Sequence, residues 1–101
     1  MINVTLNVYG GKAPNPIKVV IDNINNTNDF YYHSKSSFNQ NFDLPDGKYM
    51  MTVSGINPSS ANAHTDIKVT GEFSVGPLHN DHRDVSSQFY SEIFYFEILT
   101  S

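Results

Sequence analysis

The feature that most constrains this chain is an alternation of apolar and polar residues that recurs along most of its length. In the first such segment, residues 2–8 (INVTLNV), every second residue is apolar. Successive side chains of a β-strand point to opposite faces, so this spacing predicts a strand with one buried and one exposed face. No window of helical length has the i, i+3, i+4, i+7 spacing of an amphipathic helix. We therefore expect an all-β chain.

Turn-forming residues divide the chain into short segments of this kind. We expect strands over residues 2–8, 17–21, 30–33, 38–44, 49–53, 67–75 and 89–99, with Gly71 as a bulge inside the sixth. The polar stretches at residues 22–29, 57–64 and 76–87 are expected to be loops. This spacing is typical of a single antiparallel β-sandwich of about seven strands over residues 1–101. A small closed β-barrel is the alternative.

Composition narrows the classes of function. The chain has 101 residues, no cysteine and a formal net charge of −4. Without cysteine there is no disulfide framework and no thiolate metal site, and nucleic-acid binding usually needs the opposite charge. No apolar run reaches the roughly 18–20 residues that span a bilayer, and no signal peptide is visible. We expect no nucleic-acid partner and no membrane insertion, and the compartment stays open.

No motif indicates catalysis. Serine is plentiful, but no G-x-S-x-G nucleophile elbow is present. The glutamates Glu72, Glu92 and Glu97 have no visible partner for acid–base chemistry, and a surface position is the default for this residue type. We therefore expect a protein that is not an enzyme and needs no cofactor.

The segment 43–53 (DLPDGKYMMTV) contains a turn that leads into a strand. Pro45 presets φ, and Gly47 is expected to take a positive φ that feeds Tyr49 into the core. The segment resembles the L-P-x-G-x-Y-x-x-x-V stretch of transthyretin-like and carboxypeptidase-regulatory-like (prealbumin-like) domains, over about a tenth of the chain. The resemblance implies a β-sandwich, a non-catalytic module, and a tyrosine, here Tyr49, that packs at a sheet corner.

The last expected strand, residues 89–99, is apolar on both faces. We expect its inward face to carry Phe94, Phe96 and Ile98. Its outward face then carries Ile93, Tyr95 and Leu99. The outer face of a two-layer sandwich is usually polar, so either loops of this chain or another protein chain should cover this one. A terminal strand is also often an edge strand, whose open backbone groups can pair with another chain.

This strand leads to the first hypothesis for function. We expect a non-catalytic protein-interaction or assembly module, either self-associating as a homo-oligomer or bound to a protein partner. A subunit of a larger surface or secreted structure is one such module. The residues predicted to form the interface are Ile93, Tyr95 and Leu99.

Two other hypotheses depend on clusters of side chains. A carbohydrate-binding module would use the aromatic platform of Tyr31 and Tyr32 with His33, although strand aromatics more often fill a core. A metal-binding protein would use the segment 78–84 (LHNDHRD), although a solvated loop is the commoner interpretation. Its nitrogen and oxygen donors for a divalent cation would be His79, His82, Asp81 and Asp84.

Overall fold

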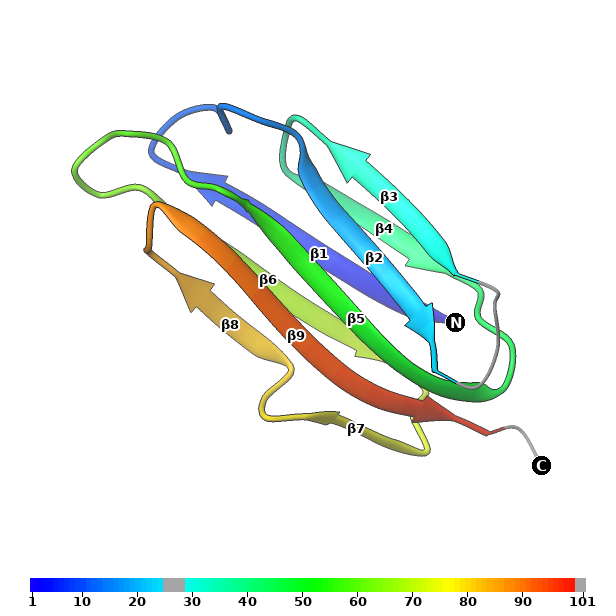
Figure 1. The fold of residues 1–101 in the computed structure, drawn as a ribbon. Coiled ribbons are helices and arrows are strands. Elements are labelled where there is room, and N and C mark those ends of the chain that lie inside the picture. The colour runs from blue at the N-terminus through cyan, green and yellow to red at the C-terminus, as the bar shows by residue number, and fades with distance from the viewer. Residues whose placement is uncertain (25–28, 100–101) are drawn as a thin grey trace.

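The fold is a two-layer β-sandwich (Figure 1). A computed structural model describes residues 1–24 and 29–99. This part of the chain contains no helix, and its strands are β1 (Ile2–Tyr9), β2 (Ile17–Asn23), β3 (Phe30–Ser34), β4 (Phe38–Phe42), β5 (Gly47–Ile56), β6 (His64–Gly71), β7 (Val75–Leu78), β8 (His82–Val85) and β9 (Phe89–Ile98). The all-β prediction is therefore confirmed.

The strands form two antiparallel sheets that do not close into a barrel. The four-stranded sheet has the order β4-β1-β6-β8, and the five-stranded sheet has the order β3-β2-β5-β9-β7. The chain changes sheet between β1 and β2, and again at every step from β3 to β9 (Figure 1). Apart from β2 and β3, neighbouring strands within each sheet are therefore not consecutive in the sequence. The sandwich prediction is confirmed, and the barrel alternative is wrong.

The region from residue 67 to residue 87 differs from the sequence prediction. Gly71 ends β6 instead of forming a bulge in one long strand, and the expected loop at residues 76–87 contains β8 and most of β7. Gly71 has a φ of +155°, and a Cβ there would lie 2.8 Å from the Met1 carbonyl oxygen. Only glycine fits this position, and from here the chain crosses to the five-stranded sheet as β7. The polar turn expected at residues 22–29 lies partly outside the described residues.

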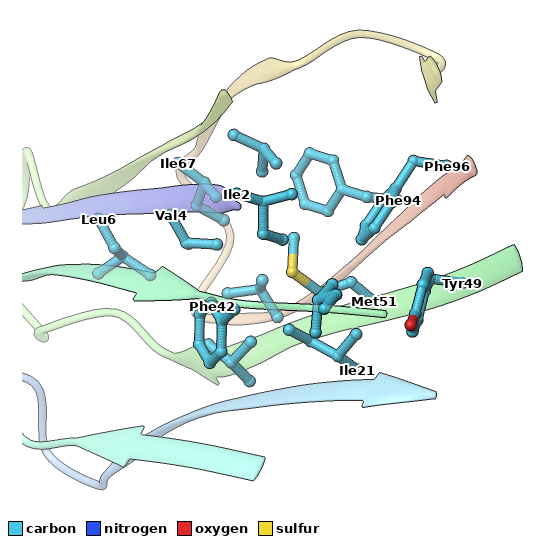
Figure 2. Close-up of a cluster of buried hydrophobic side chains, with 14 of the residues drawn as sticks. Ile2, Val4, Leu6, Ile21, Phe42, Tyr49, Met51, Ile67, Phe94 and Phe96 are labelled. Atoms are coloured by element: carbon cyan, nitrogen blue, oxygen red, sulfur yellow. The ribbon is translucent and has the colours of Figure 1, made fainter. Parts of the chain in front are cut away.

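The core is formed by the inward side chains of both sheets. They recur at every second residue of β1, β2 and β5, as the alternation predicts. Figure 2 shows side chains from the two layers filling the space between them. Burying an aliphatic or aromatic side chain of this size contributes roughly 1.5–3 kcal/mol. The fully buried members are Ile2, Val4, Leu6, Ile17, Val19, Ile21, Tyr49, Met51, Val53, Ile67, Val69 and Phe94.

Tyr49 anchors the corner at which the chain enters β5. Its hydroxyl donates a hydrogen bond to the Pro45 carbonyl at 2.5 Å and accepts one from Asn23 Nδ2 at 3.5 Å. Its ring stacks on that of Phe96, with centroids 5.5 Å apart. Burial raises the pKa of Tyr49 above its usual value. The resemblance implied this packing for Tyr49, while membership of the prealbumin-like family stays a prediction.

Gly47 does not have the backbone geometry expected from the sequence. It is not among the described residues with positive φ, and it begins β5 opposite Ile98. The lack of a side chain matters for another reason, because a Cβ at Gly47 would lie 3.0 Å from Asn23 Nδ2. Asn23 is buried beside Tyr49, so Gly47 leaves room for the polar contacts of this corner.

Arg83 closes the side of the sandwich where β8 lies near β9. Its guanidinium carbon lies 3.9 Å from the ring centre of Phe94, and its Nη1 lies 3.8 Å from Glu92 Oε1. The cation–π contact and the ion pair make a charged residue acceptable at an inward position. Glu92, which shares a face of β9 with Phe94, thereby has a partner from the other sheet.

Candidate functional site

The outward face of β9 carries exposed apolar side chains. The inward residues of the strand are buried, as predicted: Phe94, Phe96 and Ile98. The outward residues Ile93, Tyr95 and Leu99 are 40%, 39% and 66% exposed. The strand lies between β5 and β7, which pairs with it at Tyr95 and Glu97, so the edge-strand prediction is wrong for its C-terminal half.

Strand register aligns outward side chains of four strands in one row. In the five-stranded sheet, Val20 of β2 pairs with Tyr31 of β3 on one side and with Thr52 of β5 on the other. Thr52 pairs in turn with Ile93 of β9. Side chains of directly opposite residues are close enough to contact each other. We call Tyr31, Val20, Thr52 and Ile93 the central row.

A second row of apolar side chains lies beside the central row. Met50 of β5 pairs with Tyr95 of β9, and Tyr95 pairs with Leu78 of β7. A shallow depression at this end of the sheet is lined in part by Ile24, Val75, Leu78 and Tyr95, all exposed. The central row together with Met50, Tyr95, Leu78 and Val75 is called the outer patch below.

The outer face of the four-stranded sheet is polar. Asn3 Nδ2 donates to Asn39 Oδ1 at 2.5 Å and to Asn41 Oδ1 at 2.8 Å, and Thr5 Oγ1 donates to Asn3 Oδ1 at 2.8 Å. The outward residues of β6 are also polar: His64, Asp66, Lys68 and Thr70. This is the composition expected of a sheet face in contact with water. The outer patch is therefore a property of the five-stranded sheet alone.

Ionisable side chains flank the central row on both sides. On one side, Asp22 and Asp29 form a carboxyl–carboxyl hydrogen bond, which raises the pKa of Asp22 together with burial and repulsion by Asp29. On the other side, Lys18 of β2 pairs with His33 of β3. Asp22 and Lys18 are the outward residues that follow and precede Val20 on β2. The row thus separates the two carboxyl groups from Lys18 and His33.

The structure separates the three residues of the carbohydrate hypothesis. Tyr31 and His33 are exposed on the outer face, whereas Tyr32 is half-buried and packs inward. The ring of Tyr32 meets those of Phe38 and Phe42 edge-on, at centroid distances of 4.9 Å and 6.1 Å. Tyr31 and Tyr32 therefore do not form one platform, and Tyr31 belongs to the central row.

The four donors of the metal hypothesis are also distributed over different structural positions. His82 and Asp84 lie on β8, whereas His79 precedes that strand with a φ of +65°. Asp81 lies just before β8, and its carbonyl accepts a hydrogen bond from the Val69 amide. Within residues 1–24 and 29–99, no three histidine or acidic side chains are arranged to hold a metal ion.

Sequence reasoning missed the partners of His82 and Asp84 on β6. His82 Nε2 lies 2.5 Å from Asp66 Oδ1, and His64 Nδ1 lies 2.7 Å from Asp84 Oδ1. Asp66 and Asp84 are directly opposite in the register of β6 and β8. Without the histidines, the carboxylates of Asp66 and Asp84 would face each other. The His82–Asp66 and His64–Asp84 pairs therefore connect β6 and β8 on the polar face. The period-two pattern predicts the face on which each residue lies, but it does not predict that β6 and β8 are neighbouring strands.

The outer patch also contains residues that sequence reasoning did not assign to the candidate site. These are Val20, Met50, Thr52, Val75 and Leu78. Their strands are distant in sequence, so only the register brings them together with Ile93 and Tyr95.

Searches with the chain against protein-family models, curated proteins and solved structures found no match. In the described part of the chain, no helix has the length and apolar character needed to cross a membrane.

Proposed function

We propose that this protein is a non-catalytic protein-interaction module that docks through the outer patch of its five-stranded sheet. The observation that supports the proposal is the alignment of Tyr31, Val20, Thr52 and Ile93 across four strands on an outward face. A contiguous apolar surface on a sheet face usually marks a binding site in a soluble protein. The polar outer face of the other sheet is the contrast within the same molecule.

The composition of the outer patch suits a protein partner. Tyrosine, isoleucine, leucine and methionine side chains bury large apolar areas, and tyrosine and methionine are enriched in interface cores. Burying one such side chain contributes roughly 1.5–3 kcal/mol before the cost of association is subtracted. Charged side chains around the patch, such as Lys18, Asp22, Lys48 and Glu97, fit the polar rim of an interface.

A pair of matched tyrosines tests this proposal. Tyr31 on the five-stranded sheet and Tyr9 on the four-stranded sheet are both exposed, at 71% and 47%. Each is replaced in turn by a photo-crosslinking phenylalanine analogue in the cells that produce the protein. We expect covalent protein adducts from position 31 that are absent from position 9, because only the first lies in the outer patch. A second substitution, Ile93→Glu, should abolish the adducts from position 31.

Two results would contradict the proposal. The first is an equal yield of adducts from positions 31 and 9, which would mean random collision. The second is an unchanged yield from position 31 in the Ile93→Glu variant, which must remain folded by circular dichroism. Either result would remove the outer patch as the docking surface.

A carbohydrate-binding module is the second candidate, and the exposed ring of Tyr31 beside Val20 and His33 favours it. Only one aromatic ring of the original pair faces outward, so this module would use Tyr31 and His33 without Tyr32. Tyr31→Ala should then abolish binding on a glycan array, whereas Tyr32→Phe should preserve it. Binding that survives Tyr31→Ala would exclude this site.

A further inference from the structure

We infer that the partner of the outer patch is a second copy of this chain, stacked face to face about a two-fold axis that follows the central row. This inference rests on the proposed function and deepens it by naming the occupant. A two-fold interface brings the same patch of both copies together, so the patch must complement itself. The charges of Lys18 and Asp22 on β2 meet that condition for one direction of the axis.

The axis direction follows from the order of charges along β2. A half-turn about the central row leaves Val20 opposite Val20 of the second copy and exchanges the two ends of the strand. Lys18 then faces Asp22 of the second copy, and His33 faces Asp29. A half-turn about an axis parallel to the strands would instead place Lys18 over the uncharged Ser91 of β9. Charge complementarity therefore favours the axis along the central row.

The dimensions of the molecule allow such an interface. The two larger Cα extents are 47 and 23 Å, which bound a face of about 1,000 Å², so burying the roughly 800 Å² per partner of a stable complex requires most of this face and not the outer patch alone. Sheets that stack face to face keep their strand directions within about 30° of each other, so the central rows of both copies stay in contact. About this axis, Val20 and Ile93 of the two copies meet along the central row, whereas Met50 and Tyr95 face Ser54 and Ser91 of the second copy.

Charge reversal at Lys18 and Asp22 tests the inference. Purified wild-type protein is studied by sedimentation velocity over a wide concentration range and should show a monomer–dimer equilibrium. In the Lys18→Asp dimer, an acidic side chain at position 18 of each copy faces Asp22 of the other copy. In the Asp22→Lys dimer, a lysine at position 22 of each copy faces Lys18 of the other copy. Each variant should raise the dissociation constant at least about tenfold. Lys68→Asp, on the polar face, is the matched control for the first change and should leave the dissociation constant as it is.

Mixing the two variants gives the sharper result. The chain with Lys18→Asp is acidic at both positions, and the chain with Asp22→Lys is basic at both positions. Every contact between the two different chains is therefore attractive. We expect the mixture to form a heterodimer at concentrations where each variant alone is monomeric. Raising the salt concentration should weaken this heterodimer, because the contacts are partly exposed to solvent.

The outcomes separate this inference from the proposed function. A wild-type chain that stays monomeric at high concentration, while position 31 still forms adducts with another protein, overturns the second copy but keeps the docking surface. Self-association that ignores both charge reversals overturns the axis along the central row. Loss of position-31 adducts in cells, with dimers still present in the purified protein, would contradict the proposed docking surface and the inference together.

Discussion

The substitution Tyr49→Phe tests how much the Tyr49 hydroxyl, at the corner of the sandwich, contributes to the stability of the fold. This substitution keeps the fully buried ring and its stacking on Phe96 but removes the hydrogen bond to the Pro45 carbonyl. The second contact, with Asn23 Nδ2, is long at 3.5 Å, so most of the loss comes from the hydrogen bond to the Pro45 carbonyl. We expect a loss of about 1–2 kcal/mol of unfolding free energy.

Thermal and urea unfolding measure this loss. In a domain of this size, each kcal/mol corresponds to about 4–8 °C in Tm, so the variant should melt about 5–15 °C lower. Tyr31→Phe is the control, because that ring is exposed and its hydroxyl donates a long hydrogen bond to Asp29 Oδ2, at 3.5 Å. Equal melting temperatures for the two variants would refute the corner as a source of stability.

The pH dependence gives a second measurement on the same variant. Burial raises the folded-state pKa of Tyr49 above 10.0, its usual value. The neutral phenol is therefore favoured in the folded chain, and its contribution is fully present below pH 10 and lost as the pH rises through the folded pKa. Tyr49→Phe should accordingly lose less stability than the wild type between neutral and strongly alkaline pH. A parallel loss in both proteins would contradict the assignment.

Three further predictions concern residues of β9 and Asp22 of β2. Phe96→Glu should unfold the chain, because it places a carboxylate in the core and removes packing worth about 3–5 kcal/mol, whereas Tyr95→Glu should stay folded and lose association; far-ultraviolet circular dichroism and sizing distinguish them. Tyr90→Phe should change the urea midpoint little, because Thr65 is the neighbour of the buried Tyr90 hydroxyl and no contact of that hydroxyl within the described residues has good hydrogen-bond geometry. The hydrogen bond with Asp29, burial and repulsion by Asp29 raise the pKa of Asp22, so the folded chain disfavours its carboxylate form at a pH above that pKa. Asp22→Asn should therefore melt at a higher temperature than the wild type at pH 7 and at no higher temperature at pH 3, measured on dilute monomer.

The sequence predicts, for most strand residues, whether the side chain points into the core or toward solvent. Phe94 and Phe96 were assigned to the inside and Ile93 and Tyr95 to the outside, and burial agrees. The alternation works because one face of each strand must exclude water, and a shift of one residue would expose every core side chain at once. This constraint acts within a strand and requires no knowledge of its neighbours.

The strands β7 and β8 were not predicted, because their sequences lack the usual alternation of a strand. β7 contains Gly76 and Pro77, which typically indicate a turn. β8 places Arg83 and Val85 inward and His82 and Asp84 outward, so a charged residue occupies a core-facing position. The position is tolerated only because Phe94 and Glu92 lie opposite, and that contact is a property of the assembled sandwich.

The candidate site was predicted only in part for a similar reason. Ile93 and Tyr95 were identified from β9 alone, but Val20, Thr52 and Met50 were not, because register between distant strands is decided by the whole fold. Tyr31 was assigned to a different hypothesis altogether. Its membership of the central row becomes visible only when β3 is paired with β2.

The contrast between the two outer faces also limits the kind of assembly that this chain can form. The asparagine and threonine side chains of the four-stranded sheet bond to one another, and covering them would remove water from their remaining donors and acceptors with little apolar area in return. Only the five-stranded sheet gains from being covered. A face-to-face pair about a two-fold axis uses that surface once in each copy and leaves the polar faces in water. In the dimer proposed above, burial of the outer patch would therefore stop growth at two copies, whereas a chain with two apolar faces would continue to stack.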